Sequence, residues 1–174
     1  IKHNSNKHNL AASLYLSKYK DFIEAYKFLG VQKGAPTYQS VNESDAEIWG
    51  GELSSTYYLN EAKYGTSFLT SLAFAQGDDT TTNEPLESVQ PFNAKFSIRY
   101  NTDDDKWLHA LTANYVGEPR VKSGTKTFIP ESYVTFDLTT KYRYSEKLNL
   151  SAGIYNLTDE QYYNYQNVKG LETD

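Results

Sequence analysis

Charged side chains recur at even spacings within several stretches of this chain, and they are the residues best able to do chemistry. Even spacing places such side chains on one face of a strand, where each could meet a charged solute or pair with a neighbour of opposite sign. The pattern therefore predicts either a path for a polar solute or simply a polar wall. The residues concerned are Glu52, Lys95, Arg99, Asp137, Lys141 and Arg143.

The sequence contains none of the residue sets that enzymes and metal sites usually require. There is no Gly-x-Ser-x-Gly, no His-Glu-x-x-His and no phosphate-binding loop. The absence of cysteine excludes disulfides, zinc ribbons and thiol catalysis. Asp103, Asp104 and Asp105 are consecutive, so their carboxylates diverge and lack calcium-loop spacing. We therefore predict that the protein is not an enzyme, and that these aspartates form a solvated turn and no metal site.

The composition restricts the class of fold. Hydrophobic residues make up 39% of the 174 residues, the mean hydropathy is -0.68, and there are 16 Tyr against 8 Phe. Such a chain is too polar for a helical membrane protein and too aromatic for a disordered one. It has no run of about 18 apolar residues that could form a membrane helix. The net charge of -5, without a basic stripe, argues against a nucleic-acid partner.

Strand-like alternation of apolar and polar residues organises most of the chain. Long and short connections follow each other in turn, as in bacterial outer-membrane barrels, and the segments are long enough to cross a bilayer when tilted. The predicted fold class is all-β, an antiparallel transmembrane β-barrel, here a partial barrel of about seven strands. The predicted strands are residues 9–19, 48–60, 64–76, 92–101, 106–116, 132–144 and 148–155.

The alternation also assigns each side chain to lipid or to the lumen. The charged residues named above are predicted to face the lumen. The residues predicted to face lipid are Phe92, Phe96, Ile98, Phe136, Leu138, Leu150 and Ile154. The long connections 20–47, 77–90 and 117–131, with residues from 158 onward, are expected on the outer surface of the cell. The short turns 61–63, 102–105 and 145–147 are expected on the opposite side.

Four sequence stretches resemble a known family. Residues 148–171 read LNLSAGIYNLTDEQYYNYQNVKGL, with the turn signal Asn-Leu-Thr-Asp, and residues 17–24, 47–59 and 115–120 read SKYKDFIE, EIWGGELSSTYYL and YVGEPR. In this order they resemble the late strands of TonB-dependent outer-membrane receptors, in particular the haem and haemoglobin receptors. The resemblance implies that residues 1–174 are a C-terminal segment of the receptor barrel, with the plug, the early strands and the closing strand outside it.

The family resemblance also implies a function, a location and partners. The whole receptor would lie in the outer membrane of a bacterium and import haem, captured from haem or haemoglobin by extracellular loops. A plug outside this segment would couple it to the TonB energy-transducing complex, and outer-membrane lipid would surround the barrel. No cofactor is expected within residues 1–174, because haem would be the transported ligand.

Tyrosines and histidines are the candidate contacts for such a ligand. Tyr162, Tyr163 and Tyr165 could help to capture it from the last extracellular loop, because exposed tyrosines supply rigid amphipathic contact area; they could equally anchor the chain at the membrane interface. The sequence contains three histidines, His3, His8 and His109. None is expected to face an open cavity on the outer side, so no haem ligand is assigned to this segment.

Three alternatives to the haem receptor remain open from the sequence alone. The first is a ferric-siderophore receptor of the same family. The second is a small eight-stranded outer-membrane barrel that serves as an adhesin or anchor, which would need one more strand than the alternation predicts. The third is a soluble antiparallel β-sandwich, whose strands would ordinarily be shorter.

Overall fold

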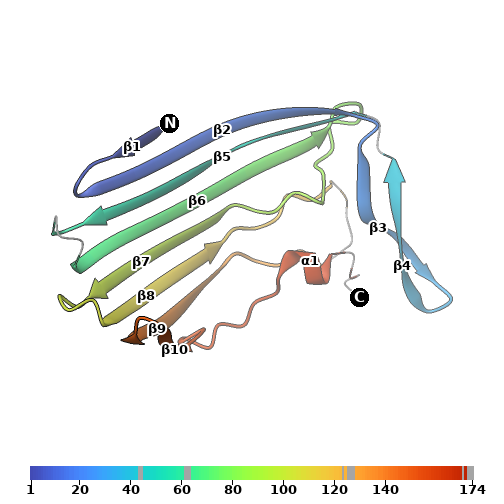
Figure 1. Ribbon diagram of the computed structural model, residues 1–174. Coiled ribbons are helices and arrows are strands. Elements are labelled where there is room, and N and C mark those ends of the chain that lie inside the picture. The colour runs from blue at the N-terminus through green and yellow to red at the C-terminus, as the bar shows by residue number, and fades with distance from the viewer. Residues whose placement is uncertain (43–44, 61–63, 123, 125–127, 170, 172–174) are drawn as a thin grey trace.

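The computed structural model describes residues 1–42, 45–60, 64–122, 124, 128–169 and 171. In this part of the chain, eight antiparallel strands form one sheet in the order β1-β2-β5-β6-β7-β8-β9-β10 (Figure 1). Their bounds are β1 (Lys2–Asn4), β2 (His8–Lys20), β5 (Asp45–Tyr58), β6 (Gly65–Asp79), β7 (Asn93–Asn101), β8 (Trp107–Val116), β9 (Tyr133–Ser145) and β10 (Leu148–Ile154). A separate hairpin contains β3 (Ile23–Gln32) and β4 (Ala35–Asn42), and the short helix α1 spans Tyr165–Val168.

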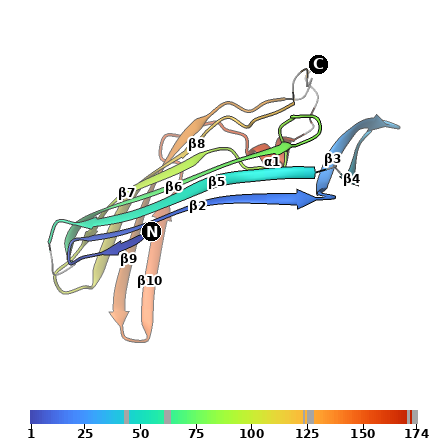
Figure 2. The same ribbon diagram turned by 90° about the horizontal axis from the view of Figure 1, so that it is seen from above.

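The sheet is a twisted and open wall. Seen from above, β9 and β10 run steeply across the direction of β2 and β5 (Figure 2), as the right-handed twist of strands accumulates from one neighbour to the next. The outermost strands of the described sheet, β1 and β10, do not pair with each other. An open, strongly twisted antiparallel wall is what the sequence predicted for a partial barrel. Because eight strands lie in one sheet instead of two sheets packed face to face, the structure disfavours the β-sandwich alternative.

The strand register divides the side chains between an apolar face and a polar face. Phe96 pairs with Ala113, which pairs with Phe136, whereas Arg99 pairs with Ala110. Directly paired residues share a face and successive residues alternate, so Phe96 and Arg99 lie on opposite faces, as predicted. We call the face with Phe96 the outer face and that with Arg99 the inner face. The large apolar residues left exposed on the outer face include Leu14, Leu16, Trp49, Phe96, Ile98, Leu111, Phe136, Leu138, Leu150 and Ile154.

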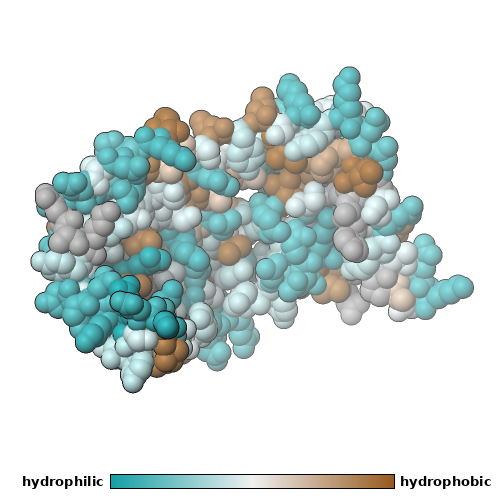
Figure 3. Space-filling model, in the orientation of Figure 1, coloured by the Kyte–Doolittle hydropathy of each residue, from teal (hydrophilic) through white to brown (hydrophobic). Residues whose placement is uncertain are grey.

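Little of the apolar surface is buried in a core. Where the structure describes the burial of a side chain, the buried hydrophobic residues are Ala46, Leu86, Tyr165 and Val168, all near the loop end of the sheet. In the view of Figure 3, hydrophilic and neutral residues cover most of the visible surface, and hydrophobic residues project along the upper margin, where Figure 1 shows β1 and β2. A broad exposed apolar face is stable only against another apolar phase or protein. Among the described residues no helix has the length and hydrophobicity needed to cross a bilayer.

The long and short connections lie at opposite ends of the strands (Figure 1), as the sequence predicted. At the short end, Asp105 adopts a positive φ of 54° and its amide donates to the Thr102 carbonyl at 2.9 Å. Hydrogen bonds from the Thr102 hydroxyl and the Lys106 backbone amide lower the pKa of Asp104. A hydrogen bond from the Asn101 side-chain amide, together with the charge of Arg143, lowers the pKa of Asp105. These aspartates form an exposed turn, as expected. The predicted turn at residues 61–63 lies outside the described residues.

The sequence missed three strands. Residues 20–47 were expected to be a loop, but they contain the hairpin of β3 and β4. Its tip is Lys33-Gly34, with φ of 52° and 80°, and positive φ at both central residues is typical of a type I′ hairpin turn. Because Lys is an unusual first residue there, the turn signal was weak. The third missed strand, β1, pairs with β2 through only Lys2, His3 and Asn4.

The separation of loops and turns predicts which residues a reagent outside the cell can reach. Thr82→Cys, in the exposed loop between β6 and β7, is expected to react on intact cells with a maleimide too large for porins. Asp104→Cys, in the turn at the opposite end, is expected to react only after the outer membrane is permeabilised. Each variant is the control for the other, and the reverse pattern would show that the orientation is inverted.

Candidate functional site

All six charged residues that the sequence assigned to the lumen share one face of the sheet, the face that we call inner. Glu52 pairs with Ala73, Lys95 with Ser71 and Arg99 with Ser67, in each case opposite a small residue. Asp137 and Lys141 pair on the same face with Thr112 and Leu108. Arg143 pairs with Asn149 and binds the Asp105 carboxylate at 2.7 Å.

The charges on the inner face are unevenly compensated. Within the described residues, Lys95, Arg99 and Lys141 make no ion pair, and neither does Glu52. Asp137 is held by neutral donors instead, including the Asn114 side-chain amide at 2.8 Å. The wall therefore leaves several cations available to an anionic group, which the alternative of mutually paired charges did not predict.

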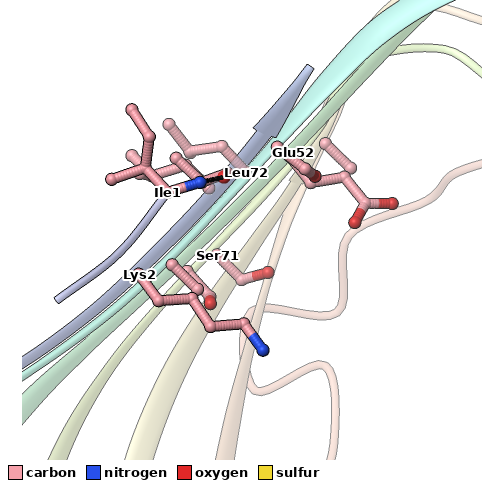
Figure 4. A pocket seen from close by; sticks show the side chains of 11 residues that line it. Ile1, Lys2, Glu52, Ser71 and Leu72 are labelled. Carbon is pink, nitrogen blue, oxygen red and sulfur yellow. Dashed lines mark hydrogen bonds between the residues drawn. The ribbon is translucent and has the colours of Figure 1, made fainter. Parts of the chain in front are cut away.

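A hollow of about 520 Å³ lies over the inner side of β1, β2, β5 and β6 (Figure 4). Its floor is made of small residues, because the register sets Ala11 beside Ser54 and Ser54 beside Ser71. Lys2 and Glu52 stand at its sides, and in Figure 4 both side chains project from the same side of the strands. Small side chains between charged ones leave room for another part of a protein or for a polar solute to approach the wall.

The long connections meet at the other functional region, which we call the loop cluster: residues 38, 78–90, 117–133 and 162–171 among those described. Ion pairs join its parts, Arg120 to Asp78 at 2.8 Å, Lys122 to Glu84 at 3.1 Å and Lys169 to Glu87 at 3.9 Å. The Tyr38 hydroxyl donates to the Lys169 carbonyl at 3.3 Å. The first two pairs are partly exposed, and such pairs contribute at most about 1 kcal/mol each, so they orient the loops more than they stabilise the fold. The third pair, Lys169 with Glu87, is largely buried.

Aromatic side chains fix the C-terminal residues within the loop cluster. Tyr162 stacks on Tyr133 with ring centroids 4.2 Å apart, and Tyr163 meets Phe128 edge to face at 5.1 Å. Tyr162 and Tyr163 remain 46% and 59% exposed, whereas Tyr165 is only 6% exposed.

Tyr165 therefore does not lie where the sequence analysis expected a ligand-contacting tyrosine. It is the first residue of α1, which begins after Asn164, whose side-chain oxygen accepts from the Gln166 amide at 3.0 Å. An asparagine followed by a short helical turn is an N-cap signal that could have separated Tyr165 from its two neighbours. Tyr133 and Phe128 were missed because their contacts join distant parts of the sequence.

The three histidines lie away from the loop cluster, as the sequence predicted. The His8 ring contacts the Ser55 hydroxyl at 2.9 Å, and its centroid is 6.3 Å from that of His3. On the outer face, His109 contacts the Thr140 hydroxyl at 3.0 Å and stacks against Trp107. No group of three or more His, Cys, Asp or Glu side chains among the described residues could hold a metal ion.

Comparisons with known proteins identify the family. The family model described as TonB dependent receptor-like, beta-barrel, matches residues 1–157. Hemoglobin-haptoglobin-binding protein A of Haemophilus influenzae is 27% identical over an alignment of 187 residues, which covers 93% of this chain and 18% of that protein. This chain thus spans less than a fifth of the length of that curated relative.

Solved structures agree with this assignment. The copper transporter OprC superposes with a TM-score of 0.77 at 26% identity, over 94% of this chain and 25% of its own. The ferric yersiniabactin uptake receptor FyuA from Yersinia pestis superposes with a TM-score of 0.66 at 19% identity, over 94% of this chain and 24% of its own, and shows the fold alone. The chain therefore belongs to the TonB-dependent receptor β-barrel family of the bacterial outer membrane, whose members are receptors and transporters rather than enzymes.

Proposed function

We propose that this chain forms wall and loops of an outer-membrane receptor that imports an iron compound, and that this compound is haem taken from haemoglobin. The observation that carries the proposal is the similarity to the haemoglobin-haptoglobin-binding protein along 93% of the chain. The exposed Tyr162 and Tyr163 support it, because rigid aromatic rings at the loop end suit the capture of a flat, largely apolar ligand.

The inner wall suits the passage of an anionic compound. Haem carries two propionate groups, and ferric siderophores are often anionic as well. Lys95, Arg99 and Lys141 make no ion pair within the described residues, so they would attract such a ligand without first having to break an existing pair. The same cations would serve equally well to hold acidic residues of a plug.

The chain would act as one part of a larger receptor. It spans 18% of the haemoglobin-haptoglobin-binding relative, and its described sheet is open at β1 and β10. Residues 1–174 would then be a late part of the barrel wall, with a plug elsewhere that contacts the TonB complex. The open sheet disfavours the alternative of an independent eight-stranded adhesin or anchor.

The main alternative cargo is a ferric siderophore or another metal compound. The similarity to a copper transporter, at 26% identity and a TM-score of 0.77, supports this alternative. It differs from the first proposal only in the ligand, because the family and the barrel wall would be the same.

Growth under iron limitation separates these cargoes. A strain that lacks its own haem receptor should grow on haem or haemoglobin as sole iron source when it expresses the complete receptor, and should fail to grow when the receptor gene is deleted. The matched control supplies a panel of ferric siderophores to the same strains. If the receptor restores growth with a ferric siderophore and not with haem, the cargo is the siderophore and not haem. The family assignment would still hold.

A further inference from the structure

The carboxylate of Asp137 ties the residues just after β10 to the inner face. Asp137 on β9 accepts a hydrogen bond from the Asn156 backbone amide at 2.9 Å through Oδ1, and one from the Asn114 side-chain amide at 2.8 Å through Oδ2. Both oxygens are therefore occupied, by donors from two different parts of the chain. Hydrogen bonds to an ionised group are stronger than those between neutral groups, so this carboxylate reinforces the backbone hydrogen bond that the Leu157 amide donates to the Phe136 carbonyl at 2.7 Å.

Asn156 turns the chain away from the sheet. It adopts a positive φ of 53°, a conformation that asparagine tolerates better than most residues. Its side chain binds the backbone of Glu160 twice, donating to the carbonyl at 3.0 Å and accepting from the amide at 3.0 Å. The Asp159 amide closes the turn on the Asn156 carbonyl at 3.0 Å. The Asn-Leu-Thr-Asp stretch is thus a rigid turn whose first residue is fixed by Asp137.

The turn directs the next residues across the inner face. We call residues 157–169 the C-terminal strap. Tyr162 of the strap stacks on Tyr133, which shares the inner face with Asp137 because both occupy odd positions of β9. Further along, Val168 is buried and Lys169 meets Glu87 and Tyr38. The strap therefore ends among the loops of the neighbouring strands, far from the sheet edge where it began.

We propose that Asp137 and Asn156 are positioning residues that hold the C-terminal strap across the inner face and so set the place of Tyr162 and Tyr163 in the loop cluster. The role in ligand capture rests on the proposed function, whereas the role in placing the strap does not. Asp137 suits this task because a carboxylate accepts on both oxygens. An asparagine there keeps one acceptor and an alanine keeps none.

Chemical cross-linking measures the position of the strap directly. Tyr133→Cys and Tyr162→Cys replace two stacked side chains, and this chain contains no other cysteine. In the complete receptor in its outer membrane, a short bifunctional thiol reagent is expected to join the pair rapidly. Asp137→Ala should slow the cross-link by about tenfold or more, since a hydrogen bond to a charged group is lost, and Asp137→Asn should have an intermediate effect.

Two further variants keep the result interpretable. Glu52→Gln removes a carboxylate from the same face, but on β5 rather than on β9, and should leave the cross-linking rate unchanged. Asn156→Ala removes the two hydrogen bonds between the Asn156 side chain and the Glu160 backbone, at a position outside the strands. It supplies the test if the Asp137→Ala barrel does not assemble. Heat-modifiable migration on gels reports whether each barrel is folded. A cross-linking rate equal to the parent in folded Asp137→Ala or Asn156→Ala would overturn the proposal.

Ligand binding by the same variants separates the two proposals. A slow cross-link together with weaker binding supports both the positioning role and the capture role of the tyrosines. A slow cross-link with unchanged binding upholds Asp137 and Asn156 as positioning residues and removes Tyr162 and Tyr163 from the capture site.

Discussion

Replacing Leu138 by arginine is expected to cost about 2 to 4 kcal/mol of folding free energy in a bilayer, the range measured for cations on the lipid face of barrels near the midplane. Leu138 lies near the middle of β9, on the outer face, between Leu111 of β8 and Ile154 of β10. Its side chain is 44% exposed on that face. An arginine there would have to bring its charge into hydrocarbon or distort the bilayer around it.

The adjacent residue is a matched control. Thr139 pairs with Ala110 and Gly153 on the inner face, so Thr139→Arg places the same side chain one position away in a polar environment. Its cost should stay within about 0.5 kcal/mol, as for most surface substitutions. Denaturant unfolding of the complete receptor in lipid vesicles measures both variants. Equal costs for the two would contradict the assignment of lipid and lumen faces.

Most of the wall could be predicted from the sequence because one physical constraint acts on every strand. When one face meets an apolar phase, a slip of one residue would move every apolar side chain to the wrong side. The alternation in β7, with Phe96 and Ile98 against Lys95 and Arg99, therefore fixes both the strand and its faces. The same logic located β2, β5, β6, β8, β9 and β10.

The loop regions could not be predicted in the same way, because their residues are not sorted between two phases. The hairpin of β3 and β4 lies outside the eight-stranded sheet, so the two-phase alternation that marks the wall strands does not govern it. Burial of Tyr165 depends on segments far apart in the sequence that meet only in the folded chain. Exposed tyrosines and one buried tyrosine thus appear identical in the sequence YYNY.

The candidate site shows the same division between local and distant signals. Alternation alone predicted that the six charged residues share one face, and the strand register places all six on the same face. That this face lines the lumen stays a prediction. The contact between Tyr162 and Tyr133 and the contact between Asn156 and Asp137 each join β9 to residues that follow β10. These partners are far apart in the sequence, so no local pattern indicates that they meet. A turn motif such as Asn-Leu-Thr-Asp predicts that the chain bends, but the partners of its first two amides, Asp137 and Phe136 on β9, determine where the chain goes next.

Truncating both Tyr162 and Tyr163 to alanine is expected to weaken capture of the ligand by about tenfold to a hundredfold, because buried aromatic anchors commonly contribute 1 kcal/mol or more each to an interface and 1.4 kcal/mol is a factor of ten. The two rings are exposed yet already held by Tyr133 and Phe128, so little side-chain entropy would be lost on binding. Binding of haem or haemoglobin to the complete receptor in outer-membrane vesicles measures the effect.

Two controls distinguish capture from anchoring at the membrane interface. Tyr144→Ala removes a tyrosine that is 67% exposed at the end of β9 near the short turn, away from the loop cluster, and should leave ligand affinity unchanged. Tyr162→Phe with Tyr163→Phe keeps both rings and should retain most of the affinity, because the flat ring area is what the ligand would contact. If the double alanine variant binds as tightly as the parent while its barrel becomes less stable, the two tyrosines are interface anchors, and the ligand must be captured by other residues of the receptor.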